Sequence, residues 1–117
     1  MSQPAKRRPK RGISQRRTAR LDGLVAEAVV DCYNESEQIT GLYTMIDTNL
    51  ALPFETMVLG VLVTVERVDL NQREEIVAVS RRARVRQTVP ILDLPLPSPP
   101  PAGAEWIDAY RHWLGGG

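Results

Sequence analysis

The chain has few of the residues from which most catalytic and zinc sites are built. It contains one cysteine and one histidine in 117 residues. The single cysteine, Cys32, excludes an internal disulfide, and we expect it as a buried, reduced thiol in a helical stripe. No closely spaced pair of soft ligands is present for zinc. His112 suits a surface position or a helix C-terminus better than a catalytic base. We therefore expect no enzyme activity.

Long apolar runs are also missing. No run approaches the roughly 18 residues that would span a bilayer. The basic N-terminus is not followed by the apolar segment of a secretory signal, and no glycine-rich phosphate loop follows a predicted strand. Hydrophobic residues make up 43% of the chain and charged residues 25%, as in ordinary globular domains. These features predict a cytoplasmic domain with no membrane partner.

Charge is present in both signs, but the signs are separated along the chain. Residues 1–20 contain eight basic side chains and no acidic one, whereas the remainder contains all 14 acidic residues and seven basic ones. The formal net charge of +1 hides this separation. An acidic body suggests a cation as partner, and a basic segment suggests an anion.

Hydrophobic periodicity divides the chain into three parts. Residues 1–17 lack it and are predicted to be a disordered basic arm; residues 18–114 form one domain, and the glycines of 115–117 fray. Two helical stripes follow the arm, and Asn34 with Glu37 has the spacing of a capping box for the second helix. The first stripe comprises Leu21, Leu24, Val25, Ala28 and Cys32, and the second Ile39, Leu42, Tyr43, Ile46 and Leu50.

The period changes from 3.6 to 2 after Pro53. Short strands are predicted over 56–59, from Val61 onward, over 76–80 and over 83–89, with Arg82, Arg84 and Arg86 on one basic face of the last strand. Residues 94–101 are proline-rich and must be extended, and a helix with both tryptophans on one face follows. The predicted fold is therefore α+β. It has an N-terminal helical hairpin, a small antiparallel sheet that could curl into a barrel, a proline-rich strap and a C-terminal helix.

Carboxylates are the abundant ligand type. Calcium binds about six to eight oxygens, which acidic side chains, carbonyls and water can supply together. No EF-hand is present, because the windows that begin at Asp47 and Asp69 end at Val58 and Ser80, where a glutamate is needed. For each acidic group a solvated surface is the alternative. The leading candidate ligands are Asp31, Glu35, Glu37 and Asp47, followed by Asp69 and Glu75 of the predicted hairpin turn.

The basic residues support a second hypothesis. The N-terminal segment 1–20 and the arginine-rich strand could bind nucleic acid or an acidic protein. Neither segment has the interleaved aromatic residues that stack on bases. The alternative for the strand is ion pairing across the sheet with Glu66, Glu74 or Glu75.

Three blocks of sequence resemble the cyanobacterial calcium-binding protein family (CcbP-like). They are Glu35–Leu59, the segment Val-Pro-Ile-Leu-Asp-Leu-Pro-Leu-Pro from Val89, and Gly-Ala-Glu-Trp-Ile-Asp-Ala-Tyr-Arg from Gly103. The resemblance implies a compact α+β domain that binds Ca²⁺ without an EF-hand and acts as an intracellular buffer or regulator. Carried over to this chain, the acids of the matching blocks are Glu35, Glu37, Asp47, Glu55, Asp93, Glu105 and Asp108.

Overall fold

The computed structural model describes residues 3–116, with side chains described from residue 15 to residue 116. The described chain forms helices and one antiparallel sheet, which confirms the predicted α+β class. In chain order the elements are α1 (Gln3–Ala28), α2 (Glu35–Asn49), β1 (Phe54–Val58), β2 (Val61–Leu70), β3 (Ile76–Arg82), β4 (Val85–Pro90), the 3₁₀ turn η1 (Ile91–Asp93) and α3 (Glu105–Leu114). None of the described helices combines the length and apolar character needed to cross a bilayer.

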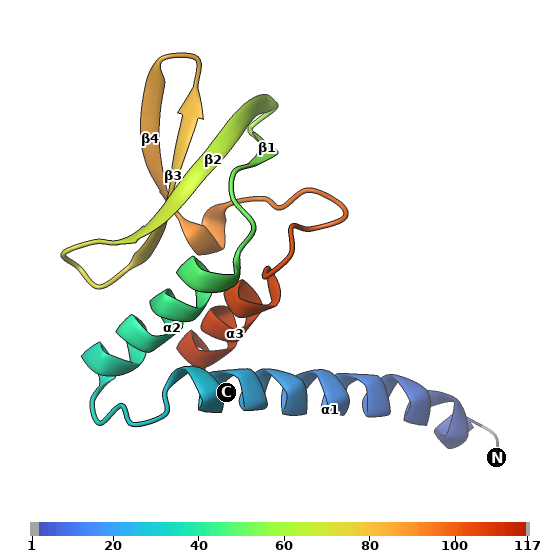
Figure 1. Ribbon diagram of the computed structural model, residues 1–117. Helices are drawn as coiled ribbons and strands as arrows, with labels where there is room; N and C mark the ends of the chain where they lie inside the picture. Colours follow the sequence, from blue (N-terminus) through green and yellow to red (C-terminus); the bar gives the residue numbers. More distant parts are fainter. Residues whose placement is uncertain (1–2, 117) are drawn as a thin grey trace.

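The helices and the sheet form layers. Helices α2 and α3 lie between the sheet and α1, which crosses them on the far side (Figure 1). Each of these elements buries one apolar face, so the main core forms where α2, α3, β2 and β3 meet. Its most deeply buried side chains are Leu42, Ile46, Ile76, Ile91 and Ile107.

The sheet is an open meander with the strand order β1-β2-β3-β4. Each strand pairs antiparallel with the next, and the first and last strands do not pair with each other. The barrel-like alternative is therefore wrong. Helices cover one face of the sheet, so its apolar side chains are buried without closure.

The local signals for α2 are confirmed. Ile39, Leu42 and Ile46 are buried on one face, and Asn34 is the N-cap, with its side-chain oxygen accepting from the Glu37 N–H at 2.8 Å. Helix α1 ends earlier than the first stripe suggests. It stops at Ala28, so Cys32 lies in the following turn and is partly exposed, not buried in a helix. The end of α1 lies close against α2, and this approach requires Gly41: a Cβ there would lie 2.2 Å from the Ala28 carbonyl oxygen.

The other end of α1 lies within the segment for which the sequence predicts a disordered arm. The backbone is helical from Gln3 onward. Arginine, lysine, alanine and glutamine are good helix formers, so they can extend the helix that begins the packed domain. The side chains of residues 1–14 are outside the described residues, and the division into arm (1–17), domain (18–114) and tail (115–117) stays a prediction.

The arginine-rich segment is a hairpin, not a single strand with one basic face. Arg82 ends β3, Ala83 and Arg84 form the turn, and Ala83 has a φ of +53°. Arg81 pairs with Arg86 across the hairpin, and Arg82 pairs with Val85. Since cross-strand partners share a face and consecutive residues alternate, the arginines project from both faces of the ribbon and from its turn.

The strap and the last helix are confirmed. The Thr56 hydroxyl donates to the Pro95 carbonyl at 2.6 Å, which ties the proline-rich segment to β1. Trp106 and Tyr110 of α3 are buried, and the Trp113 indole N–H donates to Gln38 at 3.0 Å. The turn into α3 passes against the end of α2 at Gly103, where φ is +89° and a Cβ would lie 2.1 Å from a backbone oxygen.

Candidate metal centre

The six predicted ligands fall into two groups. Asp31, Glu35 and Glu37 lie at the corner between α1 and α2, whereas Asp47, Asp69 and Glu75 lie along α2 and the β2–β3 hairpin that faces it. Within the part of the chain whose side chains are described, no three Asp, Glu, His or Cys residues are close enough to hold one metal ion. The six candidate ligands are therefore not gathered into one cluster, and which of them bind a metal ion stays a prediction.

The corner carboxylates have local structural roles. Asp31 adopts a left-handed backbone conformation (φ +62°) that reverses the chain between the helices; Asp and Asn tolerate this conformation better than most residues. Glu35 and Glu37 occupy the first turn of α2, where they interact favourably with the helix dipole. Glu37 also accepts the Tyr33 N–H through Oε1 at 3.3 Å.

Asn71, which is not among the predicted site residues, organises the β2–β3 turn. The Asn71 side-chain oxygen accepts from the backbone N–H groups of Arg73 and Glu75, each at 2.9 Å. Its amide nitrogen donates to Glu75 Oε1 at 3.2 Å, so the Glu75 carboxylate is partly engaged in holding the turn. Glu74 accepts from the Ser36 hydroxyl, which fastens the turn to the first part of α2. The spacing of Asn71 before a predicted turn was the signal for this role.

The charges of Asp47 and Asp69 both act on one hydroxyl, that of Tyr43. The Tyr43 side chain extends from α2 to β2, and its hydroxyl donates to the Val68 carbonyl at 3.4 Å. Burial raises the pKa of this hydroxyl, and the carboxylates of Asp47 and Asp69 raise it further. We call these two residues the Asp47–Asp69 pair. It joins α2 to the end of β2, a juxtaposition that only the tertiary structure produces.

Asp69 has two other partners. It lies 3.8 Å from an Arg67 guanidinium nitrogen and accepts the Leu70 N–H at 2.9 Å. The ion pair is exposed, with more than half of each side chain accessible, so it is weak and readily exchanged for another cation.

The donors around Tyr43 suit a hard cation. They are two carboxylates, a hydroxyl and a main-chain carbonyl, all oxygen atoms and none of them soft. Calcium accepts such a mixed set and fills its remaining positions with water. These oxygen atoms are of the type that calcium takes as ligands.

A family model described as calcium binding, that of CcbP, matches residues 22–114. The chain belongs to the CcbP calcium-binding family. This membership implies Ca²⁺ as the bound ion. No curated protein and no solved structure matches the chain at the same level of significance.

The matched range separates the two hypotheses drawn from charge. Residues 22–114 include all six predicted ligands and the arginine hairpin, and they exclude the basic residues before Asp22. Calcium binding thus belongs to the folded domain. Sequence reasoning named Asp47 and Asp69 but placed them in different sets; it missed Tyr43, which connects them.

Proposed function

We propose that this chain binds Ca²⁺ through surface carboxylates, without an EF-hand, and acts as a calcium buffer. The observation that carries the proposal is that the charges of Asp47 and Asp69 both act on the Tyr43 hydroxyl in a chain of a calcium-binding family. Two negative charges from separate elements thus act on one part of the surface, and a bound divalent cation would offset both.

The small number of charges at the Asp47–Asp69 pair sets the expected affinity. Calcium sites gain affinity with ligand charge and rigidity, and weak sites have dissociation constants of about 10⁻⁴–10⁻³ M. Arg67 lowers the affinity further, because it competes for Asp69 at 3.8 Å. We therefore expect weak binding, in that range.

The elements that supply the pair are already joined, which suits a buffer better than a switch. Tyr43 contacts the Val68 carbonyl, and Ser36 donates to Glu74. Binding should then need only side-chain adjustment, whereas a sensor changes the packing of its helices. In an NMR titration with Ca²⁺, shifts confined to residues around Tyr43 are the expected result, and changes throughout α1 and α3 would contradict a buffering role.

The proposal includes a non-catalytic, cytoplasmic role. The one histidine, His112, has its Nε2 atom 2.7 Å from Asp22 Oδ1, which joins α3 to α1. Cys32 lies in the connection between α1 and α2, and its thiol donates to the Val30 carbonyl. Each group thus has a partner other than the catalytic one that a nucleophile and its base would need. A single free thiol is also in keeping with a reducing compartment.

Calorimetric titration of the full chain with CaCl₂ tests the site, with MgCl₂ as the ion control. Asp47→Asn/Asp69→Asn should reduce affinity at least about tenfold, because it removes both negative charges. Asparagine still offers an oxygen to the Leu70 N–H that Asp69 now accepts. The matched variant is Glu35→Gln/Glu37→Gln, which removes two charges at the corner and should leave the affinity almost unchanged. If Glu35→Gln/Glu37→Gln instead lost more affinity than Asp47→Asn/Asp69→Asn, the calcium site would lie at the corner between α1 and α2.

A second readout locates the ion independently of affinity. Burial is the largest cause of the raised Tyr43 pKa, and the carboxylates of the pair raise this pKa further. Calcium held between them should therefore lower the Tyr43 pKa toward its ordinary value. Titration of tyrosine absorbance with and without Ca²⁺ measures the shift, and Tyr43→Phe should abolish the calcium-dependent part. An unchanged tyrosine titration under saturating calcium would place the ion elsewhere.

A further inference from the structure

The β3–β4 hairpin extends beyond the packed part of the molecule. Strand β3 is buried from Ile76 to Ser80, but every residue from 81 to 88 is exposed. The hairpin lies at the end of the sheet that no helix covers (Figure 1). Beyond Arg81, the last residue of β3 that pairs with β2, the hairpin is a two-stranded ribbon. Because its residues are exposed, core packing does not account for its side chains.

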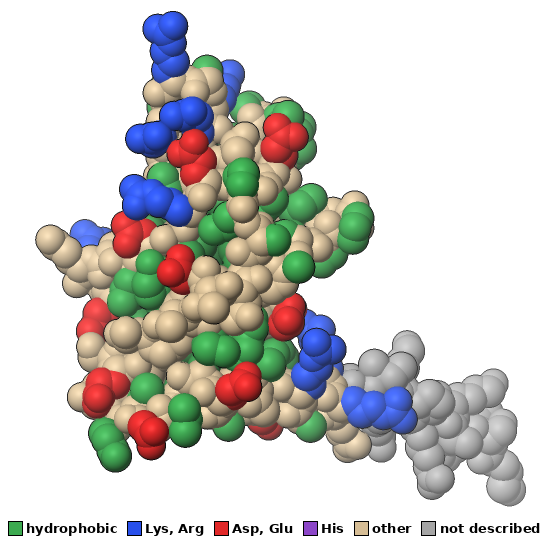
Figure 2. Space-filling model, in the orientation of Figure 1, with side chains coloured by type: hydrophobic (Ala, Val, Ile, Leu, Met, Phe, Trp, Pro, Cys, Tyr) green, Lys and Arg blue, Asp and Glu red, His purple; other side chains and the backbone are tan. Residues whose placement is uncertain are grey.

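The exposed ribbon is strongly basic. Residues 81–88 contain four arginines and no acidic residue. Basic side chains gather over this hairpin in the space-filling view (Figure 2), apart from those of α1 on the opposite side of the molecule. Arg67 of β2 lies beside the ribbon and is paired with Asp69 at 3.8 Å. The two side chains line a shallow depression together with Val79, Arg86, Gln87 and Thr88.

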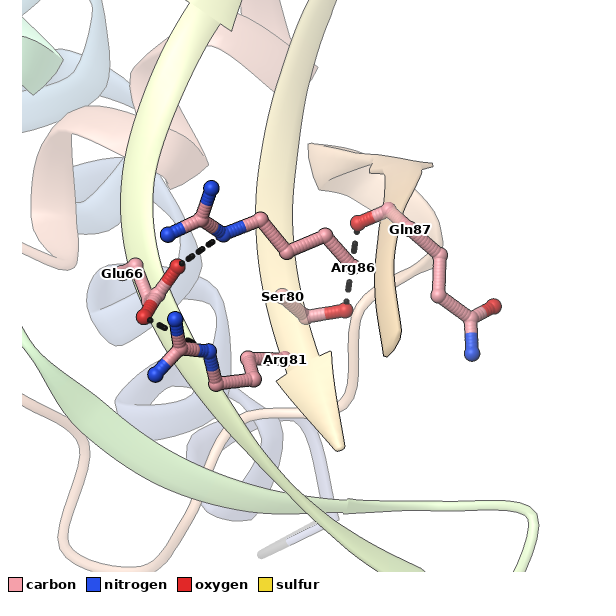
Figure 3. A network of polar contacts seen from close by, with 5 residues as sticks. All are labelled: Glu66, Ser80, Arg81, Arg86 and Gln87. Carbon is pink, nitrogen blue, oxygen red and sulfur yellow. Dashed lines mark hydrogen bonds and ion pairs between the residues drawn. The ribbon is translucent and has the colours of Figure 1, made fainter. Parts of the chain in front are cut away.

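The carboxylate of Glu66 offsets part of the positive charge of the arginines in residues 81–88. Glu66 lies between two guanidinium groups, 3.4 Å from Arg81 Nε and 3.1 Å from Arg86 Nε (Figure 3). This confirms one of the expected cross-strand ion pairs. It leaves a surplus, because Arg82 and Arg84 have no ion pair among the described residues.

The ribbon's backbone is held in a defined shape. Strands β3 and β4 are paired from Val77–Pro90 out to Arg82–Val85, and the Ser80 hydroxyl adds a bond of 3.3 Å to the Gln87 carbonyl (Figure 3). The arginines are therefore presented from a preformed strand pair, so binding does not have to order the backbone as well.

We propose that the β3–β4 hairpin binds double-stranded DNA through the phosphate backbone, with the ribbon in the major groove. The groove accepts a two-stranded β-ribbon, and a ribbon with arginines on both faces and at its turn can reach the phosphates on either side. Guanidinium groups match phosphate oxygens with paired N–H donors. Residues 81–88 contain no aromatic side chain for stacking on unpaired bases, which favours duplex over single-stranded nucleic acid and predicts little sequence preference. The proposal does not depend on calcium binding.

Fluorescence anisotropy with the full chain and a labelled mixed-sequence duplex of about two helical turns tests this proposal. Arg82→Gln/Arg84→Gln removes two positive charges without breaking a described ion pair. The matched control is Arg20→Gln/Arg73→Gln, which removes two exposed arginines from α1 and from the β2–β3 turn. Equal melting temperatures for the three proteins will show that folding is unchanged.

The expected result is a loss of at least about tenfold in affinity for Arg82→Gln/Arg84→Gln, with a salt slope smaller by about 2. The control variant should stay within about threefold of the parent at about 0.1 M salt. Arg82→Lys/Arg84→Lys should keep the salt slope, because the charges remain.

Four outcomes would overturn the proposal. One is no binding at about 0.05 M salt. Another is an equal loss of affinity in the control, which would reflect net charge alone. A third is equal or tighter binding to a single strand of the same length. The fourth is displacement of the duplex by polyglutamate at equal charge concentration, which would identify an acidic protein as the better partner.

Discussion

The two ends of strand β3 differ in packing and in charge. At its start, the β2–β3 turn rests against α2 and carries Glu74 and Glu75. At its end, the β3–β4 hairpin is exposed on both faces and carries four arginines over residues 81–88. One strand thus connects an acidic, packed end to a basic, exposed end.

The charges at the two ends are also used differently. The Glu74 and Glu75 carboxylates accept from Ser36 and Asn71 and so help to hold the turn in place. At the exposed end the only described carboxylate partner of the arginines is Glu66. The comparison indicates that the carboxylates of the acidic end hold the structure, whereas the basic end has charge left over for an external anion.

A matched pair of truncations should separate the two ends most strongly. Ile76 is 1% exposed and Val85 is 61% exposed. Ile76→Ala should lower the free energy of unfolding by about 2–5 kcal/mol, because it leaves a cavity in the core. Val85→Ala should cost less than about 1 kcal/mol. Urea unfolding measures both. Similar costs would mean that the hairpin tip is packed in solution.

Removing the cap of α2 should weaken the packed end by a smaller amount. Asn34 accepts the Glu37 N–H at 2.8 Å, and Asn34→Ala should reduce stability by about 1 kcal/mol. Asn34→Ser and Asn34→Asp retain a capping oxygen and should stay close to the parent protein in the same unfolding experiment. If all three variants lose equal stability, capping is not the reason.

The substitution Glu66→Gln tests how far this carboxylate neutralises the arginines of the basic end. Its two ion pairs involve arginine side chains that are 46% and 61% exposed, so Glu66→Gln should cost at most about 1 kcal/mol of stability. The same change frees Arg81 and Arg86, and DNA binding should become tighter by several-fold. Weaker binding in this variant would show that Glu66 positions the arginines rather than neutralising them.

Alkaline pH should slightly lower the free energy of unfolding through a group at the packed end, and the basic end should not contribute to this change. Burial raises the pKa of the Tyr110 hydroxyl, and Glu75 adds to the rise. Because the native pKa lies above the unfolded value of about 10, the Tyr110 hydroxyl stays protonated to higher pH in the native state than in the unfolded state. The stabilisation is then complete below about pH 10 and is lost as pH rises through the native pKa. Unfolding of Tyr110→Phe should vary less with alkaline pH than that of the parent, whereas Tyr33→Phe, at a side chain that is 86% exposed, should behave like the parent.

Much of the fold was predictable because its signals are local. The stripe of α2, its Asn34 cap and the docked helix α3 each depend on residues a few positions apart. The arginine strand was predicted wrongly because alternation continues through the two-residue turn at Ala83 and Arg84. A tight turn without glycine, asparagine or proline leaves no mark in that pattern.

The candidate site was predictable only in part. Composition indicated a hard cation and oxygen ligands, and the family resemblance indicated calcium. The proposed grouping of Asp47 with Asp69 was not recoverable, because their charges act on the same hydroxyl only through the packing of α2 on β2. In the sequence, Glu37 looked equivalent to the other candidate ligands. In the structure its carboxylate accepts the backbone N–H of Tyr33.

The sequence by itself determined the fold class, the calcium-binding family and the separation of acidic from basic residues, because periodicity, composition and the order of sequence blocks are properties of the linear chain. Tertiary structure decided three other matters: that the sheet stays open, that the charges of Asp47 and Asp69 both act on Tyr43, and that the arginines stand on an exposed ribbon. Each of these depends on contacts between residues far apart in the chain, and such contacts are set by how the apolar faces of whole elements are buried together.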